Sequence, residues 1–177
     1  MPWKLSSIAL LLGVAALASG QTISPPDVPE KIKAPAGEQV VLSAHASGSQ
    51  IYVCQAAADG KAAWSLKAPD AELQDSQGAV IGHHSAGPSW KYKDGSEITG
   101  KATARVNAPD SASIQWLLVN VIQHSGKKGL FSHVTSVQRI NTKGGMPPPD
   151  ADCNTAKVST EVKSPYSADY YFYAPAK

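Results

Sequence analysis

The chain has 177 residues, of which 16 are basic and 14 acidic, and its formal net charge is +2. This length suits a single domain with a sizeable hydrophobic core. The near balance of charge predicts no strong electrostatic partner. No nucleic-acid role is predicted either, because the single adjacent basic pair, Lys127-Lys128, lies between two glycines as in a solvated turn.

Residues 1–20 are typical of a secretory signal peptide. Lys4 supplies the positive start, residues 8–17 are apolar, and small residues at 16–18 and 18–20 offer two cleavage sites. The apolar run of about ten residues is too short to span a bilayer, which takes roughly twenty. The sequence therefore predicts export to an extracellular, cell-wall or periplasmic location, with no membrane span.

Residues 21–38 contain four prolines and little apolar periodicity, and we expect them to form an extended lead-in. The β domain is expected over residues 39–177. Its strands are predicted from short runs rich in β-branched and aromatic residues between turn formers. These runs lie at residues 40–42, 50–54 after a turn at Gly48, 64–66, 72–73, 79–84, 89–91, 97–106, 114–124 and 130–140, with a last strand near the C-terminus.

Turn signals recur every eight to twelve residues along this domain, and Asp94-Gly95 is the strongest hairpin signal. Pro69-Asp70 is expected to break the chain between strands, and residues 143–149 are expected to form a loop outside any sheet. This spacing is typical of a single-domain all-β fold, either a β-sandwich or a small β-barrel. A short helical turn near Pro109 is the alternative for part of the apolar run that follows it.

The two cysteines, Cys54 and Cys153, are expected to form a disulfide bond, because paired cysteines are the rule in an exported domain. In the chain-entropy model a closed loop of about 100 residues contributes roughly 4–5 kcal/mol of stability. A reactive thiol or a metal ligand is the alternative, but no CxxC or Cys–His spacing favours it.

A series of segments in fixed order also resembles a known family. They lie at residues 48–54, 69–73 with 82–90, 94–96 with 100–101, 116–118, 124–126 and 133–145. Over about residues 29–173 the chain is similar to secreted bacterial and fungal proteins catalogued only as a domain of unknown function, family 3455. The resemblance implies secretion and no settled activity.

Some fungal members of that family carry a malate dehydrogenase label. A nicotinamide-dependent dehydrogenase needs a glycine-rich turn between a strand and a helix, which brings backbone amides to the pyrophosphate. No GxGxxG motif exists in this chain, and its glycines punctuate β-hairpins instead. NAD-dependent dehydrogenase activity is therefore not predicted.

The histidines are candidate metal ligands. His83 and His84 are adjacent, so a strand directs them to opposite faces and only one can join a given site. His84, His124 and His133 form a candidate copper or zinc site, provided that the strand register brings the last two onto one face. Histidines that are hydrogen-bonded at strand ends are the alternative.

No catalytic residue is assigned. Serines near the histidines lack a GxSxG elbow and an orienting carboxylate, and the acidic residues lie in ordinary turn contexts. Trp90 and Tyr92 alternate on one face of a strand, where both rings could stack on a sugar or another flat ligand, or pack in the core.

Two functions remain open from the sequence. The first is a secreted, non-enzymatic binding or structural protein that holds a carbohydrate or small ligand at an exposed aromatic surface formed by Trp90 and Tyr92. The alternative is a metal-dependent redox or hydrolytic protein that uses His84, His124 and His133.

Overall fold

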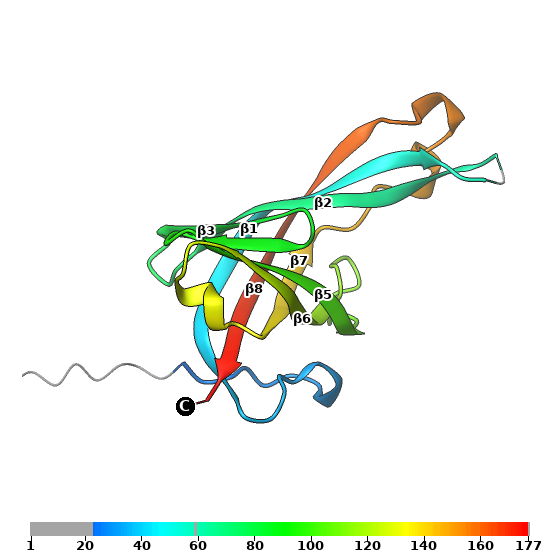
Figure 1. The fold of residues 1–177 in the computed structure, drawn as a ribbon. Coiled ribbons are helices and arrows are strands. Elements are labelled where there is room, and N and C mark those ends of the chain that lie inside the picture. Colours follow the sequence, from blue (N-terminus) through cyan, green and yellow to red (C-terminus); the bar gives the residue numbers. More distant parts are fainter. Residues whose placement is uncertain (1–22, 59, 177) are drawn as a thin grey trace, which may run out of the picture.

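The computed structural model describes residues 23–58 and 60–176 (Figure 1). Within them the chain forms eight strands and four short 3-10 helices. The strands are β1 (Glu38–Ala56), β2 (Ala62–Gln74), β3 (Val80–Ser85), β4 (Ser89–Tyr92), β5 (Ser96–Val106), β6 (Trp116–Gly126), β7 (Ser136–Gly144) and β8 (Glu161–Pro175). The helices are η1 (Glu30–Ile32), η2 (Leu130–His133), η3 (Asp150–Asp152) and η4 (Thr155–Lys157).

Each strand pairs antiparallel with the next one in the chain, and β8 pairs with β1, so that the sheet closes on itself as a barrel. The predicted all-β class is confirmed, and of the two predicted architectures the structure adopts the barrel. Closure gives every strand two neighbours, which removes the open edges of a flat sheet. The expected signal peptide, residues 1–20, lies outside the described residues.

The first strand differs from the prediction. Residues 38–56 form one continuous strand, whereas two strands separated by a turn at Gly48 were expected. Gly48 pairs with β2 on one side and β8 on the other. A Cβ atom at this position would lie 2.2 Å from the carbonyl oxygen of Asp70 and 2.5 Å from Cα of Ala71. The glycine therefore allows β2 to approach β1 closely, and it does not form a turn.

Three other local predictions are wrong. β2 runs through Pro69, in a stretch of β2 that pairs only with β1, where a missing N–H is tolerated. Residues 130–133 form the helix η2 instead of the start of a strand, and residues 143–144 still belong to β7. Residues 107–115 contain no helix, so the alternative of a helical turn near Pro109 is not adopted.

The predicted Asp94-Gly95 hairpin is confirmed, and it also positions η2. Gly95 has a φ of +89°, and Oδ1 of Asp94 accepts a hydrogen bond from the backbone N–H of Ser96 at 2.8 Å. Oδ2 of the same carboxylate accepts one from the N–H of Leu130 at 2.7 Å. These hydrogen bonds lower the pKa of Asp94, the largest cause being the side chain of Ser96.

The helix η2 inserts an aromatic side chain into the barrel near the start of β5. Phe131 is fully buried, and its ring centroid lies 4.7 Å from that of Phe172 in β8 and 5.4 Å from that of Tyr92 in β4. Apolar packing therefore fills this end of the barrel interior.

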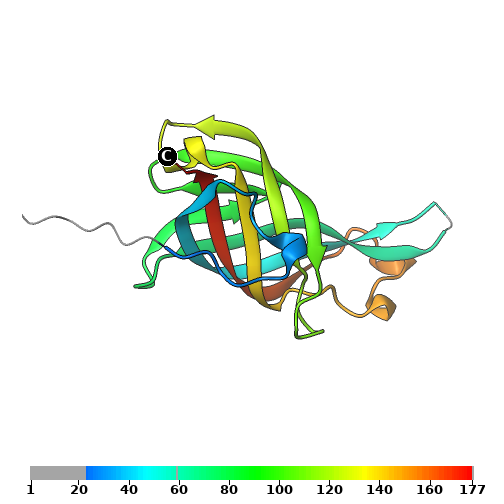
Figure 2. The ribbon, with the colours of Figure 1, turned by 90° about the horizontal axis from the view of Figure 1, so that it is seen from below.

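The segment before β1 packs on the outside of the barrel, where it crosses β7 and β8 (Figure 2). Val28 and Ile32 are buried there against Ile140 and its neighbours. The side-chain amide of Gln138 donates a hydrogen bond to the carbonyl oxygen of Ile32 at 2.6 Å, and the Tyr173 hydroxyl donates to the other end of that amide.

The predicted disulfide bond between Cys54 and Cys153 is confirmed, with a Cα–Cα distance of 5.4 Å. It joins the end of β1 to the segment that holds η3 and η4. The β1–β2 hairpin extends beyond the barrel, and that segment lies beside it (Figure 1). The indole N–H of Trp64 in β2 also donates to the Pro149 carbonyl oxygen at 3.2 Å.

Candidate functional site

A cavity of about 690 Å³ occupies the barrel interior toward the end at which β5 finishes and β6 begins. It lies away from η2, which packs near the start of β5. Most of its wall is apolar, and its polar lining residues come from β1, β2, β3, β5, β7 and β8 and from the β5–β6 connection. The polar ones are Gln50, Lys67, His84, Arg105, Gln115, Arg139 and Tyr170.

Strand periodicity places an aromatic stack in the wall of this cavity. His84 in β3 and Trp90 in β4 are cross-strand partners with inward-facing side chains, so their rings stack with centroids 4.5 Å apart and an interplanar angle of 4°. Tyr170 in β8 packs its ring edge-on against both, at 5.3 Å and 5.9 Å. Such stacked and edge-to-face pairs fix the orientation of each ring.

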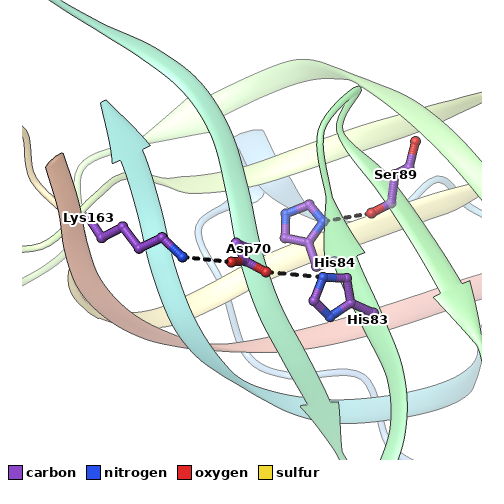
Figure 3. A network of polar contacts seen from close by, with 5 residues as sticks. All are labelled: Asp70, His83, His84, Ser89 and Lys163. Carbon is purple, nitrogen blue, oxygen red and sulfur yellow. Dashed lines mark hydrogen bonds and ion pairs between the residues drawn. The ribbon is translucent and has the colours of Figure 1, made fainter. Parts of the chain in front are cut away.

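His84 is a buried, neutral imidazole. Its Nδ1 lies 2.9 Å from the carbonyl oxygen of Ser89 (Figure 3), and because a carbonyl oxygen only accepts hydrogen bonds, the proton is on Nδ1. The pKa of His84 is lowered to about 3, mainly by burial; the hydrogen bond to Ser89 opposes the change, and the charge of Arg139 adds to it. The Nε2 atom therefore carries a lone pair.

His83, the next residue, points to the outside of the barrel, as the strand period predicts (Figure 3). Its Nε2 lies 3.2 Å from Oδ1 of Asp70, and Oδ2 of the same carboxylate is 3.2 Å from Nζ of Lys163. These side chains are about half exposed, so the network belongs to the outer surface and not to the cavity.

Arg139 carries the positive charge of the interior. Its Nε and Nη2 atoms donate to the carbonyl oxygen of Gln115 at 3.3 Å and 2.8 Å, which fixes the plane of the guanidinium group. The nearby hydroxyl of Tyr170 does not balance this charge, because burial raises the pKa of Tyr170 and keeps it protonated. No carboxylate lies within ion-pair distance of Arg139 in the described chain.

Two buried N–H donors beside the cavity have no partner among the described residues. Nε2 of Gln50 and Nε1 of Trp90 make no hydrogen bond, although each residue is only 2% exposed. A buried donor without a partner costs about 1–3 kcal/mol. A molecule bound in the cavity would offer partners to these two donors. A third donor without a partner among the described residues, Nε1 of Trp116, belongs to the cluster of Val28 and Ile32 and does not line the cavity.

Of the two aromatic residues proposed from the sequence as a ligand surface, one borders the cavity and the other does not. Trp90 and Tyr92 share a face, but the expectation of an exposed aromatic surface is wrong, because that face lines the barrel interior. Trp90 borders the cavity, whereas Tyr92 packs against Phe131 and does not line it.

The three candidate metal ligands are not brought together. His84 lies in the cavity wall, Nε2 of His124 donates to the Val134 carbonyl oxygen at 2.8 Å, and His133 is an exposed residue of η2. Over residues 23–58 and 60–176, no group of three or more His, Cys, Asp or Glu side chains could hold a metal ion. None of the helices in that part of the chain has the length and apolarity that a membrane crossing needs.

Gln50 and Arg139 were not identified from the sequence. Arg139 follows the buried Val137 by two positions in β7, so the strand period alone puts it on the inner face. The strand period was therefore enough to place Arg139 on the same face as Val137. It was not enough to predict a binding site, because that depends on the side chains that the other strands direct into the barrel.

The fold and the site define a class: over its described residues this is a closed antiparallel barrel with a cavity at one end and unpartnered donors in its wall. Residues 35–174 match the family described as a protein of unknown function, DUF3455, and the chain belongs to that family. No curated protein and no solved structure matches the chain.

Proposed function

We propose that this protein is an exported, non-enzymatic binding protein that holds one small, largely apolar ligand inside its barrel. The observation that carries the proposal is the cavity of about 690 Å³ with buried, unpartnered donors in its wall. Ligand sites typically have volumes of about 300–1,000 Å³, and barrels of eight strands are just wide enough to hold one small ligand.

The lining favours an apolar ligand over a carbohydrate. The glycan hypothesis rested on exposed rings at Trp90 and Tyr92, and neither ring is on the outer surface. Most of the cavity wall is aliphatic or aromatic, with contributions from Leu66, Ala102 and Leu117. Burying such a surface against a ligand contributes about 25 cal/mol per Å² of apolar area.

Export is supported by two features of the chain. Residues 1–20 have the pattern of a cleavable signal peptide. The Cys54–Cys153 disulfide bond is typical of an oxidising compartment. The ligand is therefore one that the protein meets outside the cytoplasm.

The proposal is tested by titrating the purified, oxidised protein with the neutral, apolar dye N-phenyl-1-naphthylamine and measuring its fluorescence. We expect saturable binding of one dye per chain. Ala102→Trp places an indole in the cavity and should weaken binding at least about tenfold, the equivalent of about 1.4 kcal/mol.

Thr103→Trp is the matched control, because Thr103 is the next residue of β5 and is exposed on the outer face. It should bind the dye as the wild type does. The proposal is wrong if the wild type shows no saturable binding, or if the two variants weaken binding equally while both remain folded.

A further inference from the structure

The cavity is lined by cationic side chains and by no acidic one. Lys67, Arg105 and Arg139 contribute to its wall, whereas Asp and Glu are absent from it. Lys67 is neutralised at the rim by an ion pair with Glu161. The side chain of Arg105 is exposed and makes no ion pair or hydrogen bond in the described chain, and the side chain of Arg139 contacts only neutral groups.

The interior is also rich in hydrogen-bond donors that lack acceptors. A guanidinium group has five N–H donors. Arg139 directs two of its nitrogens to the Gln115 carbonyl oxygen and also hydrogen-bonds to the Tyr170 side chain, which leaves some of the five without an acceptor. Gln50 and Trp90 add the two unpartnered donors of the same cavity. A carboxylate matches this set, because its two oxygens accept about four hydrogen bonds and carry the opposite charge.

The remainder of the wall suits an apolar body. Pro69, Leu117, Val119 and Met146 line the cavity with the aromatic stack, and they offer no hydrogen bonds from their side chains. A volume of about 690 Å³ corresponds to roughly twenty non-hydrogen atoms if each takes about the 30 Å³ of a water molecule.

We infer that the ligand is a small amphipathic carboxylate whose charged group pairs with Arg139 and whose apolar body fills the rest of the cavity. Gln50 and Trp90 contribute further neutral donors to the wall of the same cavity. This inference rests on the proposed function, and it specifies the class of ligand.

The test compares two ligands that have the same apolar chain and different head groups. Dodecanoate and dodecanol compete with N-phenyl-1-naphthylamine at neutral pH. A hydrogen bond to a charged group is worth about 1.5–3 kcal/mol, so dodecanoate should displace the dye at concentrations about tenfold lower or more. This measurement needs no variant.

Variants locate the effect. Arg139→Gln should reduce the preference for dodecanoate to about one while dodecanol still displaces the dye, and Arg139→Lys, which keeps the charge, should retain most of the preference. Lys143→Gln is the matched control, because it removes one positive charge from an exposed position of the same strand. It should leave the preference unchanged.

The outcomes separate the two proposals. If the wild type does not bind the dye, the proposed function is wrong. If it binds the dye and both ligands displace it equally, the protein binds apolar molecules but the carboxylate inference is wrong. If Arg139→Gln fails to fold, the comparison of the two ligands in the wild type and in Arg139→Lys tests the carboxylate inference. If the preference for dodecanoate disappears in Lys143→Gln, the assignment to Arg139 is wrong.

Discussion

The buried, neutral His84 should make this protein sensitive to acid. The residue is 2% exposed, and burial lowers the pKa of its imidazole from 6.5 to about 3 in the folded state. Between these values the unfolded chain binds a proton that the folded chain does not. The contribution of His84 to stability is therefore complete above about pH 6.5 and is lost progressively as the pH falls toward 3.

The size of the effect follows from the same difference in pKa. At pH 4.5 the unfolded histidine is two pH units below its own pKa, and each unit is worth about 1.4 kcal/mol. The wild type should therefore lose about 3 kcal/mol of unfolding free energy through this residue between pH 7.5 and pH 4.5. The charged neighbours that act on the imidazole are Arg139 and His83, and both lower its pKa.

Urea unfolding followed by tryptophan fluorescence measures this loss in the wild type and in His84→Gln. The variant should start less stable, because it lacks the ring stack on Trp90, but its loss between the two pH values should be smaller by about 3 kcal/mol. His133→Gln is the control from an exposed position that does not act on His84, and it should lose as much as the wild type. Equal losses in the wild type and His84→Gln would refute the reasoning.

Three further outcomes are expected from urea unfolding at neutral pH. Gly48→Val should destabilise the protein by about 3 kcal/mol or more, because its Cβ would overlap the backbone of β2, while Ser47→Val at the exposed neighbouring position should change little. A small effect of Gly48→Val would mean that the strands separate easily there. Replacing both Cys54 and Cys153 with serine should cost roughly 4–5 kcal/mol, and a cost below about 1 kcal/mol would contradict the loop-closure argument. Gln50→Leu should raise stability by about 1 kcal/mol or more, because it removes an unpartnered buried donor, and it should weaken dodecanoate binding; lower stability would show that the amide is satisfied.

Features of the fold that depend on neighbouring residues could be predicted from the sequence. The turn at Asp94-Gly95 is specified by those two residues. The opposite directions of His83 and His84 follow from the strand period, and the pairing of the cysteines follows from the expectation of export. In each case the relevant physics involves a few adjacent residues or a single pair.

Features that depend on strands far apart in the chain could not be predicted. Gly48 and Pro69 are turn formers by local preference, yet both lie inside strands. The reason for Gly48 is a contact with β2, more than twenty residues later, and Pro69 is tolerated because of where the pairing with β3 begins. The register of β1 on β2 and the point at which β3 begins to pair supply these reasons, and neither leaves a local mark on the sequence.

The residues of the cavity could not be predicted from the sequence for a similar reason. A period of two residues puts Trp90 and Tyr92 on one face, but it does not say whether that face is inside or outside. Arg139 has the same ambiguity, since an arginine in a strand is usually exposed. Only when β1, β4, β7 and β8 meet does the inner face of each strand border a common cavity.

The polar groups inside the barrel are costly to the fold on its own. Two unpartnered donors and an unpaired guanidinium group lie in an interior that apolar side chains could fill at lower free energy. At the η2 end of the same barrel, Phe131 and Phe172 do fill the interior in this way. The two ends of the barrel therefore differ in role. Packing at the η2 end stabilises the barrel. The donors at the other end destabilise the empty barrel, and an amphipathic carboxylate would satisfy them on binding.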